Sequence, residues 1–393
     1  MIEDTLQRYA RQDVPPSRLQ AADVLVEARR RNRRRTRLTG AVAGAATVLA
    51  AFGGVAVVRA VVTAPIAAAG AGCTVVQLEI PGGTSGGVVA SGIDPSGRYV
   101  IGKTGARDAP RAVLWTDGIP AVLREAFTPQ AVNASGVIAG FTGPDRHGGE
   151  AQQRPVVHDG TRLVQLPLPD GATGGAAYAV NGHGDVLGTA VRADGSPIAV
   201  RWRTGGTAAI VTTVAGASGL GLTDDGVAVG FDLPNPHPLR WAADGVTTAL
   251  PVPRGAESAT AAAAAGDWAV GDATLPPTGS KDDLTAEAAV RWNLRTGAVE
   301  LIPGVGGHRV SASGTVAGTT GTGAPALWHG GRIFTLPLPP GAAQFNVTLS
   351  GITADGHGLA GGVEISAGPI ATSGPNGDPV VSDRTVPVLW HGC

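Results

Sequence analysis

The chain has 393 residues, of which 60 are Gly, 29 are Pro and only 16% are charged; this composition is far from that of a helical enzyme and close to that of a turn-rich all-β protein. The net charge of -1 is the sum of two segments of opposite charge. Residues 1–37 hold ten Arg against five acids, whereas residues 73–393 hold 26 acids against 19 basic residues. The acidic segment is unsuited to nucleic acid, so we expect no nucleic-acid partner.

Residues 1–37 are predicted to form a cytoplasmic basic segment. Ser17 is a good N-cap for a short amphipathic helix, and an Arg-rich stretch at residues 29–37 follows that helix. Arginines next to an apolar segment mark the cytoplasmic side of a membrane span. The N-terminus is therefore expected inside the cell.

Residues 38–62 are predicted to be a single transmembrane helix. The stretch from Leu38 to Val58 contains no charged residue, and as a helix it would be about 31 Å long, enough to cross a bilayer core. A cleaved signal peptide is the alternative, since residues 67–69 offer small side chains for cleavage. The long basic leader and the long apolar segment favour an uncleaved anchor, which a linker at residues 63–72 joins to the next domain.

Residues 73–393 are predicted to form an all-β domain, a seven-bladed β-propeller. Short apolar segments separated by Gly and Asp, as at residues 136–140, recur seven times and read as strands of a meander. Six of the 7 Trp fall at one repeat position, which a His occupies in the remaining copy. The Trp spacing averages about 46 residues, within the range of four-stranded propeller blades.

The recurring aromatic position is interpreted as the core of each blade. Alternation along the strand places the indole and a branched residue on one face, where they can pack against the neighbouring blade. These residues are expected to pack rather than to bind a ligand. They are Trp115, His158, Trp202, Trp241, Trp292, Trp328 and Trp390.

The two ends of this domain complement each other. Residues 73–82 resemble a fourth strand with no blade before it, and residues 387–393 resemble a third strand with no fourth strand after it. Pairing of the two fragments would complete one blade and bring Cys73 and Cys393 to the same turn. We therefore predict a Cys73–Cys393 disulfide that closes the ring, formed in an oxidising compartment outside the membrane.

The pattern at residues 131–140, followed by an apolar strand that ends in Trp and a Gly turn, resembles the HAF-type extracellular repeat of bacterial surface proteins. The resemblance covers about residues 73–393 and implies the propeller fold and an extracellular location, but no activity. The His that names the repeat is matched only by His237. The N-terminal arrangement is similar to bacterial anti-sigma and related single-pass proteins, although residues 1–37 lack the His and Cys of a zinc-type domain.

Short sequence motifs in the chain match known signatures but do not predict a catalytic or metal site. Residues 83–87 match G-x-S-x-G, but a strand follows where a nucleophile elbow needs a helix. Residues 356–361 match a dinucleotide fingerprint but form the turn and second strand of a repeat. We expect no cofactor and no metal. Asx residues ahead of the second strands are expected to cap turns; they are Asp94, Asn133, Asn181, Asp224 and Asp355.

Two long links between second and third strands, at residues 272–288 and 362–387, are predicted to form a binding rim. Such links and the links between blades emerge on one face of a propeller, and variable loops on a rigid scaffold commonly carry function. Neutral drift in loop length is the alternative. The candidate rim residues are Lys281, Asp282, Asp283, Glu287, Glu364, Asp378, Asp383 and Arg384.

These features favour a protein of the bacterial cytoplasmic membrane that displays the propeller on the extracytoplasmic side. Its expected role is a binding or interaction module for a protein or an envelope glycan, rather than an enzyme. One alternative is an envelope enzyme acting on carbohydrate or another hydrolysable substrate, which would need at least two carboxylates converging at the central mouth. A second alternative is transmembrane signalling through a regulator bound to residues 1–37.

Overall fold

A computed structural model describes most of the residues after position 65. The described ranges are 66–68, 72–82, 87–106, 109–144, 150–204, 209–233, 236–276, 287–373 and 379–393. The predicted cytoplasmic segment and transmembrane helix lie outside these ranges. Within them, no helix has the length and apolar character needed to cross a membrane.

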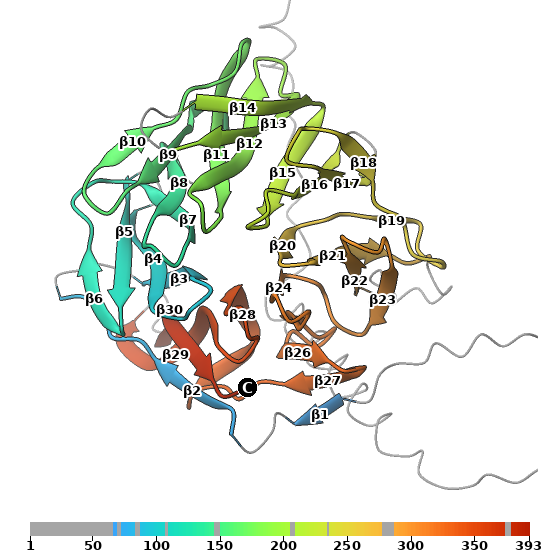
Figure 1. The fold of residues 1–393 in the computed structure, drawn as a ribbon. Coiled ribbons are helices and arrows are strands. Elements are labelled where there is room, and N and C mark those ends of the chain that lie inside the picture. The colour runs from blue at the N-terminus through green and yellow to red at the C-terminus, as the bar shows by residue number, and fades with distance from the viewer. Residues whose placement is uncertain are drawn as a thin grey trace, which may run out of the picture. The chain divides into compact units, whose positions relative to one another are not determined.

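The described chain folds into seven antiparallel sheets arranged as the blades of a propeller around a central axis (Figure 1). Blade 1 contains β3 (Val89–Ile93), β4 (Tyr99–Ala106), β5 (Ala109–Thr116) and β6 (Ile119–Val122). Blade 2 contains β7 (Thr128–Val132), β8 (Ile138–Thr142), the 3-10 turn η1 (Glu150–Gln152), β9 (Arg154–His158) and β10 (Leu163–Gln165). Blade 3 contains β11 (Ala172–Val180), β12 (Asp185–Arg192), β13 (Pro197–Arg203) and β14 (Ala209–Ala215).

The remaining blades follow in chain order. Blade 4 contains β15 (Ala217–Leu222), β16 (Ala228–Asp232), β17 (Pro238–Trp241) and β18 (Thr247–Ala249). Blade 5 contains β19 (Ser258–Ala259), β20 (Ala263–Ala265), β21 (Trp268–Thr274), β22 (Glu287–Asn293) and β23 (Val299–Pro303). Blade 6 contains β24 (Arg309–Val310), β25 (Val316–Thr319), β26 (Pro325–His329) and β27 (Arg332–Thr335), with β1 (Ile66–Ala68) parallel to its outer edge. Blade 7 contains β28 (Ala342–Ile352), β29 (Leu359–Ser373), β30 (Pro379–His391) and β2 (Thr74–Gln77).

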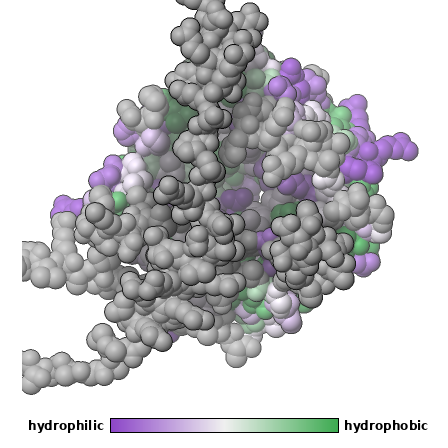
Figure 2. Space-filling view, turned by 180° about the vertical axis from the view of Figure 1, so that it is seen from behind, coloured by the Kyte–Doolittle hydropathy of each residue, from purple (hydrophilic) through white to green (hydrophobic). Residues whose placement is uncertain are grey.

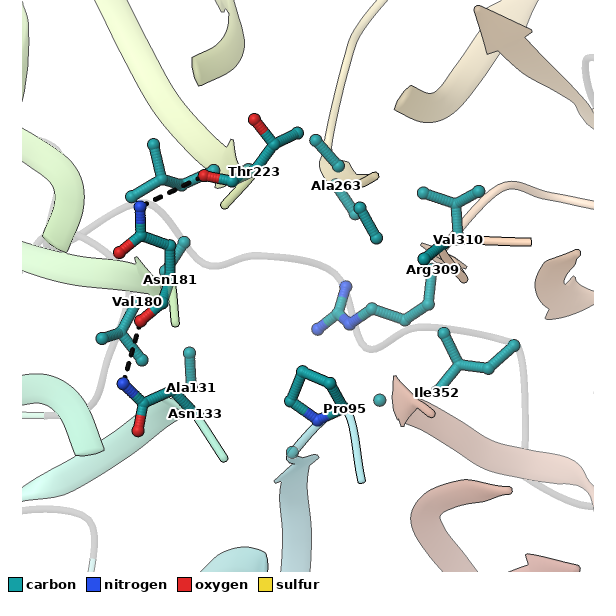
Figure 3. A pocket seen from close by; sticks show the side chains of 18 of the residues that line it. Pro95, Ala131, Asn133, Val180, Asn181, Thr223, Ala263, Arg309, Val310 and Ile352 are labelled. Atoms are coloured by element: carbon teal, nitrogen blue, oxygen red, sulfur yellow. Dashed lines mark hydrogen bonds between the residues drawn. The ribbon is translucent and has the colours of Figure 1, made fainter. Parts of the chain in front are cut away.

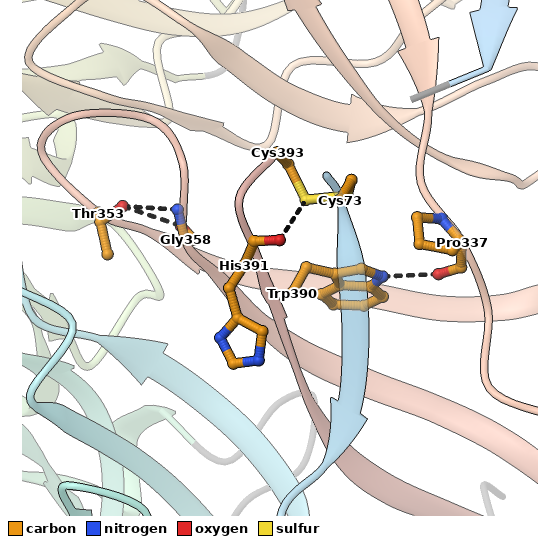
Figure 4. Close-up of a disulfide and its surroundings, with 7 residues drawn as sticks. All are labelled: Cys73, Pro337, Thr353, Gly358, Trp390, His391 and Cys393. Carbon is orange, nitrogen blue, oxygen red and sulfur yellow. Dashed lines mark hydrogen bonds between the residues drawn. A yellow bond between two sulfur atoms is a disulfide. The ribbon is translucent and has the colours of Figure 1, made fainter. Parts of the chain in front are cut away.

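Blade 7 joins the two ends of the ring, as the sequence predicts. Strand β2 pairs antiparallel with β30, so that Val75 lies opposite Trp390. The Cys73–Cys393 disulfide closes the turn beside this pair (Figure 4). The predicted disulfide is confirmed, and it joins two cysteines that are 320 residues apart in sequence.

The recurring aromatic position lies in the interior between blades. Its six Trp and His158 are all buried. Four indole Nε1–H groups donate to a carbonyl oxygen in the link from the preceding blade: Trp115 to Glu79, Trp202 to Pro167, Trp292 to Pro251 and Trp390 to Pro337, at 2.7 or 2.8 Å. His158 instead stacks on Phe127, with ring centroids 6.1 Å apart.

A repeated β-bulge shapes the inner strands, which line the central axis. The pairing register between first and second strands slips at one extra residue in five blades: Ser91, Gln130, Tyr178, Leu220 and Ser350. In all seven blades, a Cβ added to one glycine of the second strand would clash with a carbonyl oxygen of the first-strand segment. These glycines are Gly102, Gly140, Gly188, Gly230, Gly271, Gly318 and Gly361. Close approach of the two strands therefore explains why every repeat carries glycine at this position.

Replacing Gly318 by alanine is expected to lower the free energy of unfolding by about 2–3 kcal/mol, because the new methyl group would collide with the carbonyl oxygen of Gly306. Gly321, in the next turn of the same blade, is the matched control, since a Cβ there meets no atom within 4 Å. Denaturant unfolding should show a lower midpoint for Gly318→Ala and an unchanged or slightly higher one for Gly321→Ala. Equal midpoints for the two variants would contradict the close approach.

Candidate binding sites on the two faces of the propeller

The predicted rim residues fall on blades 5 and 7. Lys281, Asp282, Asp283 and Asp378 lie outside the described residues. Glu287 is the first residue of β22, and Glu364 lies half-buried on β29. Asp383 and Arg384 lie on β30, where they pair through the backbone with Ser366 and Ile365.

The link at residues 362–387 is a long hairpin rather than a loop. Strands β29 and β30 remain paired from Leu359 opposite Trp390 out to Ser373 opposite Pro379. Residues 359–365 pair with β28 as well as β30, whereas the part beyond Ile365 pairs with β30 alone. The insertion in blade 7 therefore extends two strands of the blade itself.

The principal cavity lies on the opposite face from these links. It has a volume of about 390 Å³ and is lined by the ends of the inner strands and the turns that follow them, with contributions from all seven blades. Because strands alternate in direction, the turns between first and second strands lie on the face away from the links between second and third strands. Figure 3 shows the side chains around this cavity.

Polar side chains at the ends of the inner strands hold these turns. The equivalent residues in six blades are all buried: Asp94, Asn133, Asn181, Thr223, Ser311 and Thr353. Each accepts a hydrogen bond from a backbone N–H of its own turn. Asp224 and Asp355 lie one and two residues further on; Asp355 accepts a hydrogen bond from the His357 N–H of its own turn, as predicted, whereas Asp224 accepts one from the Gly182 N–H of the neighbouring blade. A threonine hydroxyl takes the capping position in both blades.

The same turns connect neighbouring blades. The Asn133 amide donates to the Asn181 carbonyl oxygen at 2.9 Å, and the Asn181 amide donates to the Thr223 carbonyl oxygen at 3.2 Å (Figure 3). Asp224 accepts a hydrogen bond from the Gly182 N–H at 2.7 Å. These contacts tie blades 2, 3 and 4 together around the cavity. In blade 7, hydrogen bonds from Thr353 and from the His357 N–H lower the pKa of Asp355 below its ordinary value.

Arg309 is the cation of this cavity. Its Nε donates to the Ser350 carbonyl oxygen at 2.7 Å and its Nη1 donates to the His308 carbonyl oxygen at 2.8 Å. These bonds fix the guanidinium so that it extends from blade 6 into the cavity (Figure 3). Burial lowers the pKa of Arg309, yet an arginine side chain keeps its charge at neutral pH.

The described lining of the cavity is otherwise nearly neutral. Asp224 is its only acid and Arg309 its only Lys or Arg. Among the described residues, no group of three or more His, Cys, Asp or Glu side chains is placed to hold a metal ion. The outer margin of the described ring mixes hydrophilic and hydrophobic side chains (Figure 2).

Sequence reasoning missed Arg309, although the repeats contain a signal that identifies it. Counting back two residues from the turn cap gives Gly92, Ala131, Ala179, Gly221 and Gly351 in the other five capped blades. Only blade 6 carries a long side chain there. Aligning the repeats on the cap, rather than on the Trp, would have exposed the exception.

No family model matches the sequence, and no curated protein matches it. The fold is similar to that of the β-propeller domain of the trilobed protease from Pyrococcus furiosus, with a TM-score of 0.52 and 12% identity over 77% of this chain and 94% of that chain. Virginiamycin B lyase from Staphylococcus aureus matches with a TM-score of 0.49 and 13% identity over 81% of this chain and 98% of that chain. The Pyrococcus propeller is described as having an open velcro topology, whereas strands β2 and β30 close the ring here. These likenesses concern the fold alone.

Proposed function

We propose that this protein is a membrane-anchored binding module whose closed propeller lies outside the cytoplasm. The observation that carries the proposal is the Cys73–Cys393 disulfide, because structural disulfides form and persist in oxidising compartments. The apolar segment at residues 38–62 and the arginines before it supply the anchor and its orientation. The likeness of the repeats to the HAF-type extracellular repeat agrees with this location.

The proposed partner surface is the rim formed by the links at residues 272–288 and 362–387. Both links join second to third strands and therefore belong to the same face of the ring. The hairpin in blade 7 extends beyond the part of β29 that pairs with β28, so its outer end adds surface without completing the blade. An envelope glycan or a partner protein is the proposed ligand.

Protease added to spheroplasts that make the full-length chain tests the location. We expect the propeller to be digested or released while residues 1–37 stay protected, since only the extracytoplasmic side is accessible. An epitope at each end of the chain reports the two outcomes separately. Protection of both ends would overturn the proposed topology, and a mature chain that begins near Ala67 would overturn the anchor.

Shortening the links tests the rim. The deletions are confined to residues 277–286 and 367–382, which keeps Ser366 and Asp383 as a two-residue turn and leaves the strand pairs of blades 5 and 7 that contact a third strand intact. We expect the variant to retain its thermal midpoint and to capture less purified cell-wall glycan or envelope protein than the unaltered chain. Equal capture by both chains would refute the rim as the binding surface.

A further inference from the structure

Arg309 is the exception at its repeat position. At its repeat position the other capped blades carry only Gly or Ala, and a Cβ on Gly221 or Gly351 would already collide with the backbone of the neighbouring inner strand. Blade 6 nevertheless places a guanidinium at this crowded position. A side chain that the repeat does not need for packing, and that costs desolvation to bury, is a candidate for function.

No carboxylate of the described residues balances the charge of Arg309. Its two hydrogen bonds go to neutral carbonyl oxygens, and Nη2 donates to no acceptor among the described residues. No carboxylate of the described chain forms an ion pair with it. A cation held in a largely neutral, partly enclosed cavity attracts anions more strongly than the same charge on an open surface.

The opposite wall of the cavity mixes polar and apolar side chains. Blades 2 and 3 lie across the ring from blade 6, and their bulge residues, Gln130 and Tyr178, both line the cavity. A ligand that spans the cavity would therefore have a guanidinium at one end and the wall that includes Gln130 and Tyr178 at the other. The volume of about 390 Å³ lies at the lower end of the range for small-molecule sites.

We propose that this cavity binds a compact organic molecule bearing one oxyanion, a carboxylate or a phosphate monoester, which pairs with Arg309. A planar guanidinium with a free terminal nitrogen can donate to either group. Asp224, the one acid of the lining, disfavours a second anionic group on the ligand. The site deepens the proposed binding function and adds a second, small-molecule ligand on the face opposite the rim.

Ligand-detected NMR titration of the full-length chain tests the proposal with three probes: benzoate, phenyl phosphate and the neutral isostere benzamide. We expect benzoate, phenyl phosphate or both to bind, benzamide to bind at least tenfold more weakly, and Arg309→Ala to weaken anion binding at least tenfold. The preferred anion distinguishes a carboxylate ligand from a phosphate ligand. Arg309→Ala should fold, because Ala131 and Ala179 occupy the equivalent position; Arg309→Gln serves as a second variant that removes only the charge.

Arg98→Ala is the matched control, since Arg98 lies exposed in the corresponding turn of blade 1 and pairs with Asp117. Anion binding to this variant should equal that of the unaltered chain. The inference is overturned if neither anion binds at 10 mM (about 2.7 kcal/mol in binding free energy), if both Arg309 variants bind as the unaltered chain does, or if benzamide binds as tightly as benzoate. Rim capture by the unaltered chain is measured separately, so that it would leave the proposed function standing if the titration overturns the anion site.

Discussion

Replacing both Cys73 and Cys393 by serine is expected to lower the free energy of unfolding by about 4–5 kcal/mol, since the disulfide closes a loop of 320 residues and so restricts the unfolded chain. Only four residue pairs join β2 to β30, so little else holds this edge of blade 7. Chemical denaturation should show a large fall in the midpoint. The folded ring should still form, because the other six blades are each continuous in sequence.

Single replacements provide the control for this prediction. Cys73→Ser, Cys393→Ser and the double variant should have the same midpoint, and each should match the reduced form of the unaltered chain, because one cysteine alone cannot form the bond. A midpoint unchanged by reduction would contradict the stabilising role of the disulfide.

Replacing Trp202 by alanine is expected to cost about 3–5 kcal/mol. Its indole is fully buried in the cluster that joins blades 2 and 3, next to Val157 and Ala177. Its Nε1–H also bonds the Pro167 carbonyl oxygen at 2.7 Å, and this carbonyl would lose its partner. Thermal or urea unfolding measures the loss.

A pair of phenylalanine variants separates packing from hydrogen bonding. Trp241 occupies the same repeat position and is buried, but its Nε1 has no hydrogen-bond partner in the described chain. Trp202→Phe should therefore cost about 1 kcal/mol more than Trp241→Phe, the usual net contribution of one hydrogen bond. Equal costs would show that the bond to Pro167 contributes little.

The propeller and its closure could be predicted because they follow from patterns that repeat. Apolar segments that recur at a fixed period identify the blades, and the two unmatched strands at the ends of the domain predict that they pair with each other. The turn caps were predicted less completely, since a search for Asx residues selects Asp224 where the Thr223 hydroxyl caps the turn, and finds Asp355 but not the Thr353 hydroxyl that caps the same turn with it. Hydroxyl and carboxamide groups both accept backbone hydrogen bonds, so residue type alone does not identify the position.

The cavity was beyond sequence reasoning for a different reason. Its lining comes from short stretches of all seven blades that are dispersed along the chain, and Arg309 stands out only when the repeats are aligned on the turn cap. The inserted segment of blade 7 was predicted to be a variable loop because it is much longer than the other links between second and third strands. Cross-strand pairing with β30 overrides that local tendency.

Because blade 7 joins the two ends of the domain, its paired strands β2 and β30 are synthesised at different times. Strand β2 leaves the ribosome before blades 1–6, whereas its partner β30 follows all of them. During this interval β2 lacks its neighbour, and its free edge could pair with another chain. A chain that ends before β30 is therefore expected to keep the edge of β2 unpaired, and blade 7 can be completed only after β30 has been made.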